Sequence, residues 1–163
     1  MSEHRAVRAA VGVFDVSHLG KLRVAGERAG DALQRAVTAD VVSLPPGRAT
    51  YALVCDDDGG CVDDVFVYRL DDRTWLVVPN TANVDAVGAA LVESGVTPVD
   101  EWDRWAILAL QGPRSFEVFR SAFPASSATE LRLHAFEPLD VGRESRLQRR
   151  AGVLPTNAKL AQV

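Results

Sequence analysis

Residues 49–79, ATYALVCDDDGGCVDDVFVYRLDDRTWLVVP, read as three consecutive β-strands separated by short acidic turns. The segments 49–55, 61–70 and 74–79 are rich in β-branched and aromatic residues, whereas the intervening DDDGG and DD contain residues that favour turns. Loops of this length join antiparallel neighbours. The stretch therefore predicts an antiparallel meander at the centre of the fold.

Helical patterns surround this meander. Apolar residues recur at helical spacing on both sides of it, and glycines end several of the segments. Strands that meander with interspersed helices are typical of the α+β class rather than a doubly wound sheet. The sequence thus predicts a mixed, largely antiparallel sheet with packed helices. Helices are expected over residues 2–11, 27–37, 80–94 and 115–123, and further strands over residues 21–25 and 106–110.

The chain divides into three parts. Residues 1–104 contain the meander with its helices and are expected to form one domain. A further strand and helix in residues 105–141 start a second subdomain. Residues 142–163 carry five basic residues and follow neither a helical nor a strand period, so they are expected to be a basic tail.

Composition excludes several classes of function. The chain has 163 residues, 47% of them hydrophobic, and a net charge of -4, so it can bury a core but lacks the basic clusters that nucleic acids require. No apolar run approaches the ~20 residues that span a bilayer, and no secretory signal is apparent. Cys55 and Cys61 flank the DDDGG turn and are expected to be free thiols in a cytoplasmic protein.

Two aspartates interrupt the second strand of the meander. Side chains alternate along a strand, so Asp64 and Tyr68 share one face while Asp63 lies on the other. Both faces are largely apolar, and a carboxylate in such a place must find hydrogen-bond donors or become protonated. At ~3.3 Å per residue, Asp64 and Tyr68 lie roughly 13 Å apart, a span that suits a long planar ligand. Asp64 is therefore a candidate site residue.

Structural roles compete with these functional ones. The two aspartates could close the turn by accepting N–H groups of the DDDGG loop, and Asp63, one residue nearer the loop, fits that role better. Asn80 ends a strand and opens a helix, where an asparagine serves either as an N-cap or as a polar contact for a heterocycle. Tyr51 adds an aromatic side chain in the preceding strand.

Other motifs carry little chemistry. The DDDGG turn lacks the alternating oxygen ligands and closing glutamate of a calcium loop. Asp15, Ser17 and His18 have the residue types of a hydrolase triad, but triads assemble from separate segments, so a capped turn is expected instead. His4 and His134 are isolated, and no metal site is expected.

Four segments, AVGVFDVSHLGKLRVAG, LPPGRATYALVCDDDGGCVDDVFVYRL, LVVPNTANVD and AILALQGP, together resemble the T-protein family of the glycine cleavage system, the tetrahydrofolate-dependent aminomethyltransferases. They follow the family's order and spacing between residues 4 and 141. The resemblance implies a three-domain clover-leaf fold with folate in its central opening. It also implies transfer of a one-carbon unit from the lipoyl arm of H-protein to tetrahydrofolate, which releases ammonia and gives methylenetetrahydrofolate.

The resemblance further implies site residues. Asp64 corresponds to the family carboxylate that contacts the amine region of folate. The tyrosines of the preceding strand and of the motif strand correspond to Tyr51 and Tyr68. The asparagine at the following strand end corresponds to Asn80, and the residue between histidine and glycine of DVSHLG to Leu19.

The chain also departs from the family pattern. The opening segment of the family, its TGYTGE-like motif and its later folate contacts have no counterpart here. We therefore expect an N-terminal portion, truncated at both ends, with weak or no activity alone. Two alternatives stay open, a non-catalytic folate-binding module and the folate domain of a sarcosine- or dimethylglycine-type enzyme.

Overall fold

The protein forms two compact units. The computed structural model describes residues 2–127, 134–140, 150–154 and 159–162. Contacts group His18–Arg104 into one unit, and Met1–Ser17 with Trp105–Val163 into the other. The first seventeen residues thus group with the segment after residue 104, whereas the sequence analysis placed them with residues 18–104.

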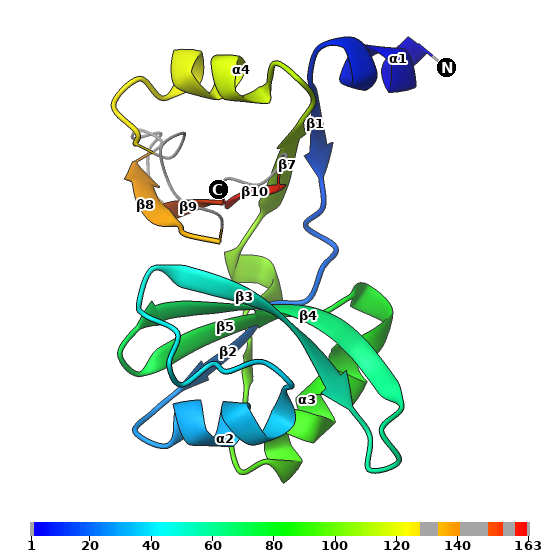
Figure 1. Cartoon of the computed structure of the whole chain (residues 1–163), viewed down its shortest axis with the longest axis vertical. Helices are drawn as coiled ribbons and strands as arrows, with labels where there is room; N and C mark the ends of the chain where they lie inside the picture. Colours follow the sequence, from blue (N-terminus) through cyan, green and yellow to red (C-terminus); the bar gives the residue numbers. More distant parts are fainter. Residues whose placement is uncertain (1, 128–133, 141–149, 155–158, 163) are drawn as a thin grey trace. The chain divides into compact units, whose positions relative to one another are not determined.

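The unit His18–Arg104 is built on a five-stranded antiparallel sheet of order β3-β4-β5-β2-β6 (Figure 1). Its strands are β2 (Leu22–Ala25), β3 (Arg48–Cys55), β4 (Cys61–Asp71), β5 (Thr74–Val78) and β6 (Val99–Asp100). Its helices are α2 (Ala29–Ala36) and α3 (Val84–Glu93), with 3-10 turns η1 (Thr81–Asn83) and η2 (Trp102–Arg104). The predicted meander is confirmed as β3, β4 and β5, and the α+β class is confirmed with it.

One face of this sheet forms the hydrophobic core. Val65 and Val67, alternate residues of β4, are buried together with Val77 of β5. Both helices lie on this side (Figure 1), where α2 contributes Leu33 and α3 contributes Leu91, each fully buried. The helical period predicted this arrangement, because the apolar stripe of each helix covers the apolar face of the sheet.

A tight turn joins β3 to β4. The Oδ1 of Asp56 accepts hydrogen bonds from the backbone N–H groups of Asp58 at 3.1 Å and Gly60 at 2.6 Å. Gly59 has a φ of 82°, a conformation that glycine adopts at little cost. Cys55 and Cys61 are register partners at the base of this turn, and both are exposed free thiols. The side chain of Asp56 thus closes the hairpin.

The second unit contains another antiparallel sheet, of order β1-β7-β10-β9-β8. Its elements are α1 (Ser2–Ala9), β1 (Gly12–Asp15), β7 (Ile107–Gln111), α4 (Ser115–Ala122), β8 (Glu137–Asp140), β9 (Arg150–Leu154) and β10 (Lys159–Gln162). Strands β9 and β10 correct the prediction of a tail without strand structure. They pair with β8 and β7 through the backbone, and such pairing does not require the alternating pattern of a sheet with one buried face.

The start of this unit contains the predicted capped turn. The backbone N–H of Ser17 donates to Oδ1 of Asp15 at 2.9 Å. The hydroxyl of Ser17 in turn accepts a hydrogen bond from the backbone N–H of Ile107 at 2.9 Å. Both side chains therefore have structural partners, in agreement with the turn interpretation.

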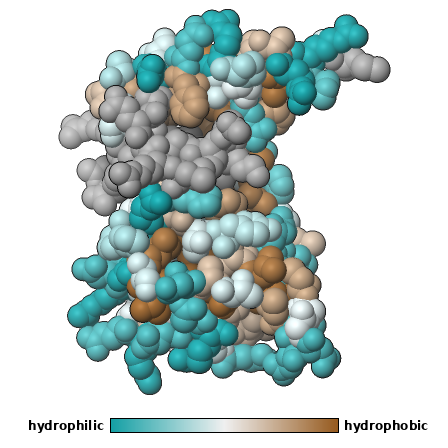
Figure 2. Space-filling view, in the orientation of Figure 1, coloured by the Kyte–Doolittle hydropathy of each residue, from teal (hydrophilic) through white to brown (hydrophobic). Residues whose placement is uncertain are grey.

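The surface mixes polar and apolar residues. On the face seen in Figure 2, hydrophobic residues lie among hydrophilic ones in both units. The exposed apolar residues of His18–Arg104 include Tyr51 and Trp102, which retain 48% and 42% of their accessible surface. Among the helices that the structure describes, none has the length and apolar character needed to cross a bilayer.

Replacement of a core residue tests this packing. Leu33→Ala removes a fully buried side chain between α2 and the sheet, so we expect the free energy of unfolding to fall by about 2–5 kcal/mol. Val92→Ala, at an exposed site in α3, is the control and should change it by no more than about 0.5 kcal/mol. Denaturant titration measures both, and equal effects would contradict the assigned core.

Candidate functional site

Asp63 is the buried centre of a hydrogen-bond cluster at the end of the meander. It lies on the core face of β4 and is 4% exposed. Its Oδ2 accepts the backbone N–H of Asn80 at 2.8 Å, and its Oδ1 accepts the side-chain amides of Asn80 at 2.9 Å and Asn83 at 2.7 Å. The prediction that Asp63 closes the turn is therefore wrong, because Asp56 fills that role.

Asp64 lies on the opposite face of β4 and is exposed. Its Oδ1 accepts a hydrogen bond from Nδ2 of Asn80 at 3.1 Å. A hydrogen bond between the Tyr51 phenol and Asp64, together with desolvation and the negative charge of Asp64, raises the pKa of Tyr51 above its ordinary value. Cross-strand pairing explains this contact, since Tyr51 is opposite Phe66 and thus diagonal to Asp64.

Aromatic rings continue from Asp64 along the same face. The rings of Tyr51 and Phe66 meet edge to face with centroids 5.7 Å apart, and those of Phe66 and Tyr68 lie 6.2 Å apart. Tyr68 is buried, and burial raises the pKa of its phenol. Tyr51 and Phe66 thus offer the accessible aromatic surface beside Asp64, whereas Tyr68 lies deeper.

Asn80 does not act as a helix cap. It precedes η1 with an extended backbone, and its side chain makes no capping hydrogen bond. Its amide nitrogen faces the two aspartates instead, with Asp63 Oδ1 at 2.9 Å and the backbone oxygen of Asp64 at 3.3 Å. The capping interpretation is therefore wrong, and the strand end at Asn80 belongs to the acidic cluster.

The loop that carries Leu19 runs beside this strand end. Gly20 donates its backbone N–H to the carbonyl of Pro79 at 2.9 Å, and the Thr81 hydroxyl donates to the carbonyl of His18. A Cβ on Gly20 would lie 2.7 Å from side-chain atoms of both Pro79 and Val84, so the close approach requires glycine. Leu19 is half-buried, and its backbone is held next to Asn80.

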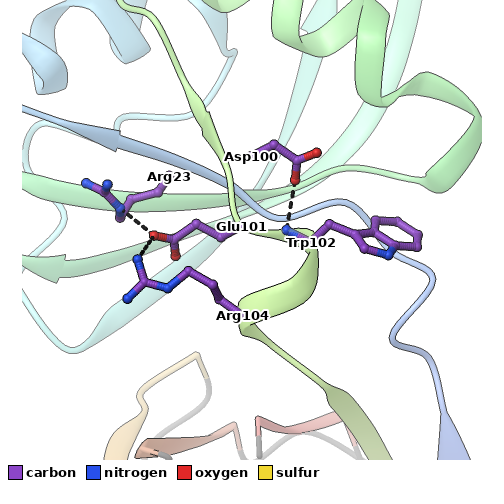
Figure 3. A network of polar contacts seen from close by, with 5 residues as sticks. All are labelled: Arg23, Asp100, Glu101, Trp102 and Arg104. Carbon is purple, nitrogen blue, oxygen red and sulfur yellow. Dashed lines mark hydrogen bonds and ion pairs between the residues drawn. The ribbon is translucent and has the colours of Figure 1, made fainter.

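A second polar cluster lies at the junction of β2 and β6 (Figure 3). The buried carboxylate of Glu101 accepts hydrogen bonds from Arg23 Nε at 2.7 Å and from Arg104 Nη1 at 3.2 Å. Asp100 accepts the backbone N–H of Trp102 at 2.9 Å, and that indole ring lies 4.4 Å from the ammonium of fully buried Lys21. These contacts hold η2 against β2 and β6 of the sheet.

Two residues of the cluster around Asp63 and Asp64 were not predicted from the sequence. Asn83 was not singled out, although its spacing of three residues from Asn80 places both amides in one turn, where they reach the same carboxylate. Phe66 shares a face with Asp64 by strand parity but was not proposed as a contact. Within the described ranges, no group of three His, Cys, Asp or Glu side chains could hold a metal ion.

The arrangement defines a chemical class of site. On one antiparallel sheet of an α+β unit, an exposed carboxylate lies beside a phenol and an accessible aromatic ring, and an amide reaches it from the residue that follows β5 and precedes η1. A carboxylate accepts hydrogen bonds from amines, and the neighbouring rings can stack on a planar heterocycle. The site is therefore suited to a ligand that is planar and carries N–H groups.

Comparisons with known proteins place the chain in a family. The sequence profile of the GCVT N-terminal domain matches residues 1–152, which extends past residue 141, where the motif resemblance ended. The aminomethyltransferase of Deinococcus deserti is 46% identical over 123 residues, which cover 73% of this chain and 34% of that protein. The aminomethyltransferase of Mycobacterium avium is 46% identical over 121 residues, which cover 72% of this chain and 33% of that protein.

Two solved structures superpose on this chain. Glycine cleavage system aminomethyltransferase T from Bartonella henselae superposes with a TM-score of 0.72 at 28% identity, covering 83% of this chain and 37% of that one. Heterotetrameric sarcosine oxidase from Corynebacterium sp. U-96 superposes with a TM-score of 0.61 at 15% identity, and the match covers 99% of this chain and 81% of that one. At this identity the likeness concerns the fold alone.

The chain belongs to the GCVT N-terminal domain family. It spans about a third of the length of the curated aminomethyltransferases that it matches.

Removal of the Asp63 carboxylate tests its structural role. Asp63→Ala removes the shared acceptor of three hydrogen bonds from Asn80 and Asn83, and only the Asn80 amide keeps other acceptors, so the free energy of unfolding should fall by about 1–3 kcal/mol. Asp64→Ala removes an exposed neighbour, leaves the buried cluster intact and should change stability little. Denaturant titration of both variants measures the difference, and similar losses would contradict the assignment.

The two tyrosines of the chain report on Asp64. Ionisation of Tyr51 places a second negative charge beside Asp64, so Asp64→Asn should lower the pKa of Tyr51 while that of Tyr68 stays raised by burial. Phenolate absorbance during an alkaline titration follows both groups. Asp57→Asn, in the exposed turn, is the control and should leave the curve unchanged.

The sign of the pH effect on stability follows from the same groups. Both phenols have a higher pKa folded than unfolded, so their contribution to stability is complete below about pH 10 and is lost as the pH rises through the folded values. The titration is therefore read only over the pH range in which circular dichroism shows a folded protein. An identical curve for Asp64→Asn and the wild type would count against the Tyr51–Asp64 contact.

Proposed function

We propose that this chain provides the tetrahydrofolate site of a glycine cleavage aminomethyltransferase. The observation that carries the proposal is the exposed Asp64 carboxylate, bound to Asn80 and Tyr51 beside accessible aromatic surface, in a chain of the GCVT N-terminal domain family. The names of its relatives support the transferase class.

The proposed reaction uses a lipoylated H-protein as partner and tetrahydrofolate as co-substrate. The aminomethyl carbon leaves the lipoyl sulfur and bridges the two folate amines as methylenetetrahydrofolate. The two amine protons that are lost end on the sulfur and on the departing ammonia, so no oxidant or metal is needed. The proposed setting is the cytoplasm.

Asp64 is the proposed catalytic residue. Its carboxylate accepts a hydrogen bond from a folate amine, which orients the amine lone pair toward the incoming carbon. A positioned group of this kind contributes about 10² to 10⁴-fold to a rate. Asn80, Tyr51, Tyr68 and Leu19 are the proposed binding residues around it.

The described residues supply one carboxylate and one aromatic wall. We therefore expect weak or no turnover from this chain by itself. The second candidate is a folate-binding module without transferase activity or a folate domain of a sarcosine- or dimethylglycine-type enzyme. Measurable ammonia release from aminomethylated H-protein, even at a low rate, would identify the enzyme, because neither alternative would act on that substrate.

Isothermal titration with tetrahydrofolate tests the site itself. We expect the wild type to bind with a Kd of micromolar order. Asp64→Ala should weaken binding at least about tenfold, because it removes a charged hydrogen-bond acceptor.

Asp57→Asn is the matched control for this titration. It removes an equal charge from the exposed DDDGG turn and should bind tetrahydrofolate as the wild type does. Wild-type affinity in Asp64→Ala would remove Asp64 from the site.

A further inference from the structure

The amide of Asn80 has a fixed orientation. Its Nδ2 lies within hydrogen-bond distance of three oxygens, Oδ1 of Asp63 at 2.9 Å, Oδ1 of Asp64 at 3.1 Å and the backbone oxygen of Asp64 at 3.3 Å. An amide nitrogen donates hydrogen bonds, whereas the amide oxygen accepts them. The three surrounding acceptors therefore select the nitrogen, and the oxygen of Asn80 points away from the aspartates.

That amide oxygen is available to a ligand. Asn80 is exposed, and no residue that the structure describes donates a hydrogen bond to its Oδ1. Asp64 is exposed beside it and, when ionised, also only accepts hydrogen bonds. The site thus presents two adjacent acceptors to the solvent.

Asp63 enforces this orientation from the other side of the strand. Its carboxylate holds both the backbone N–H and the side-chain amide of Asn80, and a third donor comes from Asn83. The ion pairs of the described residues do not include Asp63, so N–H groups stabilise its buried charge. A reversed Asn80 amide would place oxygen against oxygen at a buried carboxylate, which is costly.

We propose that Asp63 is a positioning residue that makes the site select reduced over oxidised pteridines. The inference rests on the proposed function. A tetrahydropteridine carries N–H groups at ring nitrogens that are bare acceptors in the oxidised ring. An acceptor that binds one of these N–H groups, Asp64 or Asn80 Oδ1, meets a lone pair in the oxidised ligand. A site built for a donor rejects a ligand that lacks it.

Paired titrations test the proposal. Isothermal titration of the whole chain with tetrahydrofolate and with folic acid should give a preference of at least about tenfold for tetrahydrofolate. Asp63→Asn keeps the shape of the side chain but offers Asn80 both a donor and an acceptor, so only the two oxygens of Asp64 still require the Asn80 nitrogen on this side. This variant should lose a measurable part of the preference, although Asp63 does not touch the ligand.

The ratio of the two affinities separates positioning from stability. A loss of folded protein lowers the binding of both ligands alike and leaves their ratio unchanged. Asp57→Asn removes the same charge from the exposed turn and should keep the wild-type ratio. Should Asp63→Asn fail to fold, Asn83→Ala, which removes one donor from Asp63, should give a smaller loss of the same ratio.

Each outcome decides between the two proposals. A wild type that binds both ligands equally overturns the selection but leaves the proposed folate site standing. A wild type that binds neither overturns the proposed function and the selection with it. Full preference in Asp63→Asn and Asn83→Ala would show that Asp63 does not position Asn80.

Discussion

The buried carboxylate of Asp63 is the constraint on which the site depends. A charge on the core face of a sheet is stable only if donors replace its lost hydration, and here three N–H groups from Asn80 and Asn83 do so. Those donors fix the end of β5 and the start of η1 against β4. The exposed Asp64 then receives its amide neighbour in a defined place.

The sheet gives the two adjacent aspartates different roles. Strand alternation turns Asp63 toward α2 and α3 and Asp64 toward the aromatic residues of the opposite face. One residue supports the local structure and the next meets solvent, so a single strand links the core to the exposed face beside Tyr51. The Tyr51 phenol adds a second support for Asp64 from β3.

Local patterns predicted most of the fold and part of the site. The β-branched and aromatic residues of β3, β4 and β5 predicted the meander, and the apolar stripes of α2 and α3 predicted which helix residues face the sheet, so Leu33 could be placed from the sequence. Strands β9 and β10 could not be predicted from the sequence, because they pair through backbone hydrogen bonds and their sequences follow no strand pattern. Parity assigned Asp63 and Asp64 to opposite faces, but the partners of Asp63 come from a segment 17 residues away, and proximity in sequence wrongly favoured the nearby turn.

The contact at Gly20 restricts how this part of the family can vary. The backbone of Gly20 packs so closely on Pro79 and Val84 that no side chain fits between them. A larger residue at this position would push the Leu19 loop away from the strand end that carries Asn80. The spacing between that loop and Asn80 thus depends on the absence of a single methyl group.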